Sequence, residues 1–146
     1  MTLVAYKSSS ITENKSILVL SENHQYRIDE TNTLEGKDKG TNPLNAFLGA
    51  LASSETIIAN MIAEELNFSL KSIEINIEGQ LDPEGYKGDV TLNPTFRDII
   101  LYAELDTNES EDRIQELKKM TALRCPILNI INGEKVNIKI IWNKKN

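Results

Sequence analysis

This chain of 146 residues has very few of the residues that build common catalytic and metal centres. It contains one cysteine, Cys125, and one histidine, His24. One cysteine cannot form a disulfide within the chain, and a zinc site of Cys and His would have only one ligand of each type. A Ser-His-Asp triad could use only His24. No phosphate-binding loop, EF-hand, HExxH or GxSxG pattern occurs, so we expect no metal and no cofactor.

Basic residues and long apolar runs are also scarce. The chain has 16 Lys and Arg against 22 Asp and Glu, a formal net charge of -6. Nucleic acids and anionic membranes bind basic surfaces, so we expect neither as a partner. No apolar run reaches the roughly 18 to 20 residues that span a bilayer, and residues 1–7 do not resemble a signal peptide. With a single cysteine, these features predict a cytoplasmic protein.

The length and composition predict one domain over residues 1–146. Hydrophobic residues make up 40% of the chain and charged residues 26%, which is ordinary for a folded protein. Residues 1–30 are predicted to be rich in strands, because β-branched and aliphatic residues recur there between polar turns. The strand segments are Thr2–Lys7, Ser16–Leu20 and His24–Asp29. A polar connection over residues 30–40 follows.

The strongest helix pattern covers residues 42–66. Thr41 or Asn42 can cap the first N–H groups, and Pro43 suits the first helical turn. Apolar residues then recur at steps of three and four. The middle of this helix has unusually small side chains, which allow another backbone to approach closely. We therefore expect a central helix that is packed on more than one side.

The rest of the chain alternates between strand and helix patterns. Residues 70–81 and 96–105 alternate apolar and polar side chains, as half-buried strands do. Asn108 and Glu111 resemble a capping box before a helix. The further predicted elements are a turn or mobile loop at 82–88, helices at 109–124 and 126–132, and a final strand at 135–142. Because helices are separate from antiparallel strands in this order, the predicted class is α+β.

Cys125 is the first candidate catalytic residue. It directly precedes Pro126, and proline favours the first helical position, so Cys125 would cap the short helix 126–132. A helix N-terminus and the neighbouring Arg124 both favour a thiolate, which predicts a reactive thiol. The alternative is a buried cysteine that packs as a small apolar residue.

Ser54 and Glu55 are further candidates, in the predicted central helix. Glu55 shares an apolar stripe with Leu51 and Ile58, where an unpaired carboxyl group would have a raised pKa. Ser54 would need an activating base to act as a nucleophile, and the sequence shows none. The alternative is that Ser54 is a small packing residue and that Glu55 finds a partner or reaches solvent.

Arg27 is a candidate for neutralising a carboxylate or a thiolate inside a pocket. The alternative is an ordinary strand arginine that faces solvent. We interpret Arg97 and Arg113 as surface residues.

Two segments together resemble the signatures of the OsmC/Ohr family. In residues 40–54, Pro43 opens a helix, and Ser54 stands eleven positions later, where the family has its first cysteine. The pair Cys125 and Pro126 matches the second signature. Two intermediate segments also resemble the family, residues 81–85 and 96–99. The likeness covers most of the chain in the same order.

The resemblance implies an α+β, OsmC-like fold with antiparallel sheets, built by an intertwined homodimer. Two long helices would stand back to back at its centre, with a site at each subunit interface. Active members reduce organic hydroperoxides: the first cysteine attacks the peroxide and becomes a sulfenic acid, the second traps it as a disulfide, and a dithiol restores both. Such activity belongs to the oxidative stress response, as that of the peroxiredoxins does.

The sequence departs from this pattern at Ser54, because a hydroxyl group cannot replace a thiolate toward peroxide. Cys125 matches the resolving cysteine, and Arg27 is a candidate for the arginine that positions the attacking sulfur. Three functions stay open. The first is a protein without peroxidase activity that binds a small hydrophobic ligand at the dimer interface. The second is a one-cysteine thiol peroxidase that uses Cys125, and the third is a hydrolytic enzyme that uses Ser54 and Glu55.

Overall fold

A computed structural model of the protein describes residues 1–14, 16–31, 36–133 and 135–146. These residues form two compact units, Met1–Phe47 and Leu48–Asn146. Helix α1 (Pro43–Glu65) begins in the first unit and continues in the second. Part of the predicted polar connection, positions 32–35, lies outside the described residues. The α+β class is confirmed, since the chain combines helices with two separate three-stranded sheets.

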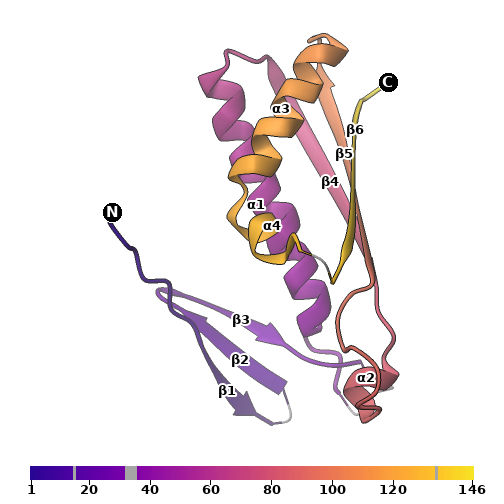
Figure 1. Cartoon of the computed structure of the whole chain (residues 1–146). Coiled ribbons are helices and arrows are strands. Elements are labelled where there is room, and N and C mark those ends of the chain that lie inside the picture. The colour runs from indigo at the N-terminus through magenta and orange to yellow at the C-terminus, as the bar shows by residue number, and fades with distance from the viewer. Residues whose placement is uncertain (15, 32–35, 134) are drawn as a thin grey trace. The chain divides into compact units, whose positions relative to one another are not determined.

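The N-terminal unit contains an antiparallel sheet in the order β1-β2-β3 (Figure 1). Its strands are β1 (Ser9–Glu13), β2 (Ser16–Ser21) and β3 (His24–Ile28). The predicted strand Thr2–Lys7 is wrong, because pairing runs from Glu13 with Ser16 to Ser9 with Leu20. A tight connection fixes the register of a hairpin, so the residues next to the turn pair first and residues 2–7 lie beyond the end of β2.

This N-terminal sheet buries very little of itself within the unit. Of its strand residues only Ser16 and Ile28 are buried, and every residue of β1 is exposed. The apolar side chains Ile11 and Tyr26 are about half exposed, at 53% and 50%. Three-stranded sheets need an apolar face packed against another layer to be stable. This unit therefore supplies too little buried surface of its own.

The C-terminal unit is built on a second sheet, in the order β4-β5-β6. Its strands are β4 (Leu70–Gln80), β5 (Asp98–Thr107) and β6 (Asn137–Lys144). β4 and β5 are antiparallel as expected, but β5 and β6 are parallel, which corrects the expectation of purely antiparallel sheets. The reason is that two helices connect β5 to β6 and return the chain to the same end of the sheet. These helices are α3 (Glu111–Arg124) and α4 (Pro126–Ile131).

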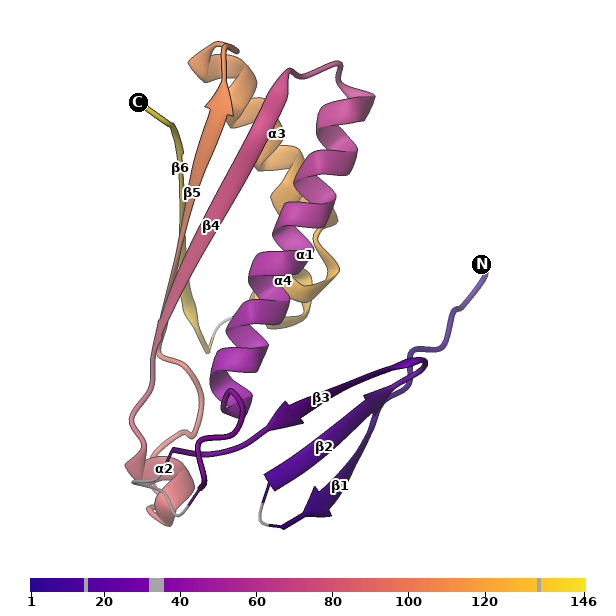
Figure 2. The same cartoon turned by 180° about the vertical axis from the view of Figure 1, so that it is seen from behind.

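In this unit α1 and α3 cover one face of the sheet, as the two opposite views show (Figures 1 and 2). The alternation along β4 and β5 sends one set of side chains to this face. There they form a continuous core with apolar residues of both helices. Its buried members are Ala59, Ile62, Ala63, Phe68, Leu101, Ala103, Leu105, Ile114, Leu117 and Trp142.

Two local predictions differ from the structure. The segment expected to be a turn or mobile loop contains a short helix, α2 (Glu84–Lys87), which ends at Gly88 with φ 136°. The cap of α3 is Ser110, whose hydroxyl accepts the N–H of Arg113 at 3.3 Å, and not Asn108. A serine cap satisfies the N3 donor as well as an asparagine does, so the alternative start two residues later is equally good locally.

Helix α1 is both a core element and an exposed one. Its Leu51, Ala59 and Ile62 are fully buried, whereas Ile57 is 66% exposed. Gly49 is exposed, and apart from its neighbours in the helix no described atom lies within 4 Å of the place where a Cβ would be. By length and composition alone this helix could cross a membrane, a test that core helices of soluble proteins also pass. Its buried face accounts for part of its apolar character.

Candidate functional site

Ser54 and Cys125 lie together in the C-terminal unit. Ser54 comes from the middle of α1, and Cys125 from the junction between α3 and α4. The Ser54 Oγ and the Cys125 Sγ are 3.3 Å apart, within hydrogen-bond distance for sulfur. The two positions that match the family's cysteine pair are therefore in contact.

The position of Cys125 follows from the local sequence. Its backbone N–H donates to the carbonyl of Thr121 and ends α3, while its own extended backbone (φ -72°, ψ 112°) starts α4. Pro126 then occupies the first turn of α4, where its missing N–H costs nothing. The Leu128 N–H donates to Cys125 Sγ at 3.5 Å, so the thiol itself caps the helix. The predicted cap position of Cys125 is confirmed.

Glu55 lies beside these two residues, with its side chain 1% exposed. The carboxyl Oε1 has no hydrogen-bond partner among the described residues. Burial raises the pKa of Glu55, and the neighbouring Cys125 lowers it by less. The prediction that Glu55 is buried, with a raised pKa, agrees with the structure.

The expectation that Cys125 is shifted toward a thiolate is wrong. The side chain is fully buried, and this burial raises the pKa of the thiol. Hydrogen bonds from Ser54 and Leu128 lower this pKa, but the neighbouring Glu55 raises it further. Arg124 does not contribute a nearby positive charge, because its guanidinium pairs with Glu65. Desolvation outweighs the effect of one short helix end.

Arg27 lies on β3 in the N-terminal unit. Its guanidinium donates to the Ser16 hydroxyl at 2.9 Å and to the Glu13 carboxylate at 2.7 Å. The side chain is 42% exposed. These contacts account for the guanidinium within its own unit, and a role for Arg27 at a thiol stays a prediction.

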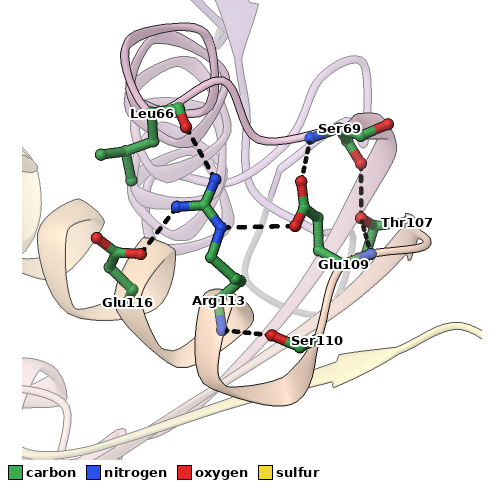
Figure 3. A network of polar contacts seen from close by, with 7 residues as sticks. All are labelled: Leu66, Ser69, Thr107, Glu109, Ser110, Arg113 and Glu116. Carbon is green, nitrogen blue, oxygen red and sulfur yellow. Dashed lines mark hydrogen bonds and ion pairs between the residues drawn. The ribbon is translucent and has the colours of Figure 1, made fainter.

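A second polar cluster was not expected from the sequence (Figure 3). Arg113 donates to the carbonyl of Leu66 at 2.8 Å, just past the end of α1, and pairs with Glu109 and Glu116. The guanidinium carbon also lies 5.6 Å from the centre of the Phe68 ring. Arg113 is 33% exposed, so it lies at the surface as expected, but its guanidinium is engaged in this cluster. Arg97 is 87% exposed, as expected.

The same cluster ties together two chain segments (Figure 3). The Ser69 N–H donates to the Glu109 carboxylate at 2.9 Å, and the Thr107 hydroxyl donates to the Ser69 carbonyl at 2.6 Å. The Glu109 N–H donates back to the Thr107 hydroxyl at 3.1 Å. The signal that could have revealed the cluster is the spacing of Glu109, Arg113 and Glu116, which places both carboxylates within reach of one guanidinium.

The chemistry available at the first cluster is limited by its residue types. It holds one thiol, one hydroxyl group and one carboxyl group, so no disulfide can form between Ser54 and Cys125. The described residues contain no group of three His, Cys, Asp or Glu side chains that could hold a metal ion. A hydrolytic enzyme would need a hydrogen bond between the Glu55 carboxyl group and the Ser54 hydroxyl, and the hydrogen bonds of the described residues join Ser54 to Cys125 instead.

Comparison with known proteins identifies relatives of this chain. A family model described as OsmC-like protein matches residues 36–141. A protein named hydroperoxide reductase from Mycoplasma genitalium is 32% identical over 136 residues, which are 89% of this chain and 90% of that protein. A hydroperoxide reductase from Mycoplasma pneumoniae is 27% identical, with the same shares of both chains.

Solved structures share the fold. An OsmC-like protein from Mycoplasma pneumoniae superposes with a TM-score of 0.86 at 23% identity, covering 98% of this chain and 99% of that one. An organic hydroperoxide resistance protein from Elizabethkingia anophelis, with thiocyanate bound, gives a TM-score of 0.75 at 17% identity and covers 99% of both chains. At these identities the likeness establishes the fold alone.

Proposed function

The chain belongs to the OsmC-like family, and from this premise we propose that it has lost two-cysteine peroxide reduction while keeping the packed site. The observation that carries the proposal is the Ser54 hydroxyl, 3.3 Å from the Cys125 thiol. The Ser54 oxygen occupies the position where a two-cysteine redox pair has a sulfur atom. We propose further that the protein is a cytoplasmic homodimer with one domain per chain.

Two-cysteine reduction needs two sulfur atoms. In the first step a thiolate attacks the hydroperoxide, the O–O bond breaks, an alcohol leaves, and the sulfur becomes a sulfenic acid. In the second step the other thiol displaces water from that sulfenic acid and forms a disulfide. The Ser54 hydroxyl can perform neither step, because it has no thiolate form and cannot form an S–S bond. Fully buried and with a raised pKa, Cys125 is also a poor substitute.

The homodimer is supported by apolar surface that the single chain leaves uncovered. Of the strand residues in the N-terminal sheet, only Ser16 and Ile28 are buried, as described above. In the C-terminal unit, α1 exposes Ile57 at 66% and Met61 at 40%, and the α3–α4 segment exposes Leu123 at 64%. A second copy of the chain would bury such surface in an intertwined arrangement, as homodimer interfaces do.

We propose that this interface holds a small hydrophobic ligand. The apolar character of Ile57, Met61 and Leu123 supports a pocket of that chemistry. A thermal-shift screen of the dimer against fatty acids and long-chain alcohols is the test. A bound ligand raises the melting temperature in a concentration-dependent way. A flat response to every hydrophobic compound would remove the ligand from the proposal.

The test of the lost peroxidase is restoration by Ser54→Cys. With cumene hydroperoxide and a dithiol such as dihydrolipoamide, this variant is expected to turn over peroxide and to form a disulfide between position 54 and Cys125. Ser53→Cys is the matched control, because Ser53 is exposed one position earlier and its hydroxyl donates only to the carbonyl of Ala50. The control is expected to gain no catalytic turnover.

Two results would contradict this proposal. Wild-type protein that consumes peroxide as fast as Ser54→Cys would show that no activity was lost. A Ser54→Cys variant that folds but forms no disulfide when treated with peroxide would show that the rest of the site no longer supports two-cysteine chemistry.

A one-cysteine thiol peroxidase is the second candidate function, with a role in the oxidative stress response. It is favoured by the name hydroperoxide reductase that both Mycoplasma relatives carry. Cys125 would attack the hydroperoxide and release the alcohol, and an external dithiol would reduce the sulfenic acid with loss of water. Cumene hydroperoxide consumption by wild type and by Cys125→Ala decides this question, since equal rates exclude Cys125 as the reacting group.

A further inference from the structure

We propose that Asn129 is a positioning residue, whose side-chain amide holds the corner between α3 and α4 and so keeps the Cys125 sulfur beside the Ser54 oxygen. The proposal deepens the proposed function and rests on it, because it names the residue that keeps the two positions of the proposed redox pair within contact distance. In this proposal Asn129 acts on the backbone around Cys125 and not on a substrate.

The corner between α3 and α4 lacks a backbone donor. In an α-helix each carbonyl accepts the N–H of the residue four positions later. For Ala122, in the last turn of α3, that residue is Pro126, which has no N–H. The carbonyls of a last helical turn need donors from outside the helix. The proline that starts α4 therefore leaves a carbonyl at the end of α3 to be satisfied by another group.

The side chain of Asn129 supplies that donor. Its Nδ2 lies 3.1 Å from the carbonyl oxygen of Ala122, 3.3 Å from that of Leu123 and 2.8 Å from that of Cys125. Carbonyl oxygens only accept, so the amide presents its NH2 end to all three. Two hydrogens serve three acceptors, which makes one bond shared, as is common at helix ends. One side chain thus joins the last turn of α3 to the residue that starts α4.

Asn129 also holds Cys125 through its backbone. The Asn129 N–H donates to the Cys125 carbonyl at 3.1 Å, so this carbonyl accepts from both the backbone and the side chain of Asn129. On the other side of the residue, the Cys125 N–H donates to the Thr121 carbonyl at 2.9 Å. With the backbone fixed at both ends, the direction of the Cβ is fixed, and the sulfur can move only between the staggered positions about χ1.

The contact with Ser54 depends on this fixed backbone. Ser54 comes from α1 and stands 71 positions earlier in the chain, and its Oγ lies 3.3 Å from Cys125 Sγ. Hydrogen bonds weaken steeply once the distance or the angle leaves a narrow range. A loosened corner would therefore lower the fraction of molecules in which positions 54 and 125 are in contact.

The experiment measures the effective concentration of two thiols in Ser54→Cys. With oxidised glutathione, the protein's two thiols lose two hydrogen atoms and form one S–S bond, while oxidised glutathione is reduced to two glutathione thiols. The glutathione ratio at half oxidation gives the effective concentration. Ser54→Cys is compared with the double variant that adds Asn129→Leu, a side chain of similar size without a donor. Asn132→Leu is the matched control, because Asn132 is an exposed asparagine at the other end of α4.

We expect Asn129→Leu to lower the effective concentration roughly tenfold, the scale of one or two lost hydrogen bonds. The control should change it by less than about twofold, as surface substitutions do. Urea unfolding of the reduced proteins is measured alongside. An equal effective concentration in the two double variants overturns the proposal. A lower stability at unchanged effective concentration would mean that Asn129 stabilises the corner without positioning the sulfur, and it overturns the proposal too.

A second measurement leaves Asn129 in place. Coupling between two equilibria is reciprocal, so bonds that favour the disulfide must themselves be strengthened when the disulfide forms. In Ser54→Cys, hydrogen exchange of the Asn129 side-chain NH2, followed by NMR, should be slower in the oxidised protein than in the reduced one. Exchange at the Asn132 side chain should not change. Equal Asn129 exchange rates in the two redox forms contradict the proposal.

Peroxide turnover by Ser54→Cys and by wild type is measured separately from both tests. A peroxide-reducing Ser54→Cys whose effective concentration does not respond to Asn129→Leu overturns only the role of Asn129. A tenfold response in a Ser54→Cys protein that does not reduce peroxide overturns only the proposed function. If oxidised glutathione forms no internal disulfide in Ser54→Cys, the role of Asn129 is excluded whatever the peroxide rate.

Discussion

The C-terminal unit holds two polar clusters that solve the same physical problem in opposite ways. Around Arg113, each carboxylate has a donor, and the guanidinium binds two carboxylates and a backbone carbonyl (Figure 3). Around Cys125, the Glu55 carboxyl group is buried with one oxygen unpartnered. In the cluster around Arg113, the charged groups are therefore all paired. The second carries an energetic cost that stability alone does not explain, which is typical of functional sites.

The two carboxyl groups show this contrast through their pKa values. A hydrogen bond from the Ser69 N–H lowers the pKa of Glu109, and the Arg113 guanidinium lowers it further. Burial raises the pKa of Glu55. Glu109 is therefore held as an anion, and Glu55 is held toward the neutral acid.

The largest effect on stability is expected from Arg113→Ala. The variant leaves the Leu66 carbonyl and the carboxylates of Glu109 and Glu116 without their donor. We expect a loss of about 3 kcal/mol of unfolding free energy, because hydrogen bonds to charged groups contribute about 1.5–3 kcal/mol each and the carboxylates keep partial access to water. Urea denaturation at fixed protein concentration measures it. Arg97→Ala, at an exposed position, should change stability by less than about 0.5 kcal/mol. Equal losses of unfolding free energy in the two variants would show that the contacts of Arg113 do not stabilise the fold.

The next largest effect is expected from Glu55→Gln, which should stabilise the protein at higher pH. Because the folded-state pKa of Glu55 is raised, its stability contribution is present below the unfolded pKa and is lost as pH rises through the folded one. Wild type should therefore lose stability relative to Glu55→Gln as pH rises above the ordinary carboxyl range, by at most about 1.4 kcal/mol per pH unit. Urea unfolding at several pH values gives the difference.

Glu65→Gln is the control for this pH dependence. Its hydrogen bond from Arg124 lowers the pKa of Glu65, so its contribution is present above the unfolded pKa and is lost as pH falls. The stability of the wild type relative to Glu65→Gln should then increase as pH rises through the acid range. The same sign for both variants would contradict the contrast between a paired and an unpaired carboxyl group.

A smaller effect is expected from the two buried threonines of this unit. Thr107→Val removes the hydroxyl that serves the Ser69 carbonyl and the Glu109 N–H, and should cost about 1–2 kcal/mol. Thr121→Val removes a hydroxyl that only donates to a helix carbonyl, and should cost less than about 0.5 kcal/mol. Chemical denaturation of the pair measures the difference, and equal costs would mean that the Thr107 bonds do not stabilise the cluster.

The smallest effect is expected at the start of α3. Ser110→Ala removes the side-chain acceptor of the Arg113 N–H and should cost about 1 kcal/mol. Asn108→Ala, at the position that the sequence pattern favoured, should be close to neutral. Thermal melts of the two variants would identify the N-cap residue. A larger decrease in melting temperature for Asn108→Ala would show that Asn108 is the N-cap.

The sequence predicts the parts of the fold that depend on local pattern. Pro43 and the three- and four-residue apolar steps predict α1, and the alternation of Ile73, Ile75 and Ile77 predicts β4. The Cys125-Pro126 pair predicts the start of α4. These signals are reliable because capping, proline geometry and strand alternation act within a few residues.

What depends on partners distant in sequence is not predictable in this way. The direction of β6 is set by the path of the connection through α3 and α4, which no residue of β6 encodes. Arg113 carries no sign that Leu66, 47 positions away, needs a donor. At the site, the apolar stripe correctly indicates a buried Glu55, but the pKa direction of Cys125 follows from total burial, which depends on the whole unit.

Gly49 has a consequence for attempts to engineer this protein. Alanine in a helix interior is about 1 kcal/mol more favourable than glycine, and nothing in the described chain obstructs a methyl group at this position. Optimising the single chain for stability would therefore replace Gly49 with alanine. In the proposed homodimer, that methyl group would occupy open space beside α1 where the second chain could pack. A substitution that stabilises the single chain would then weaken the proposed dimer.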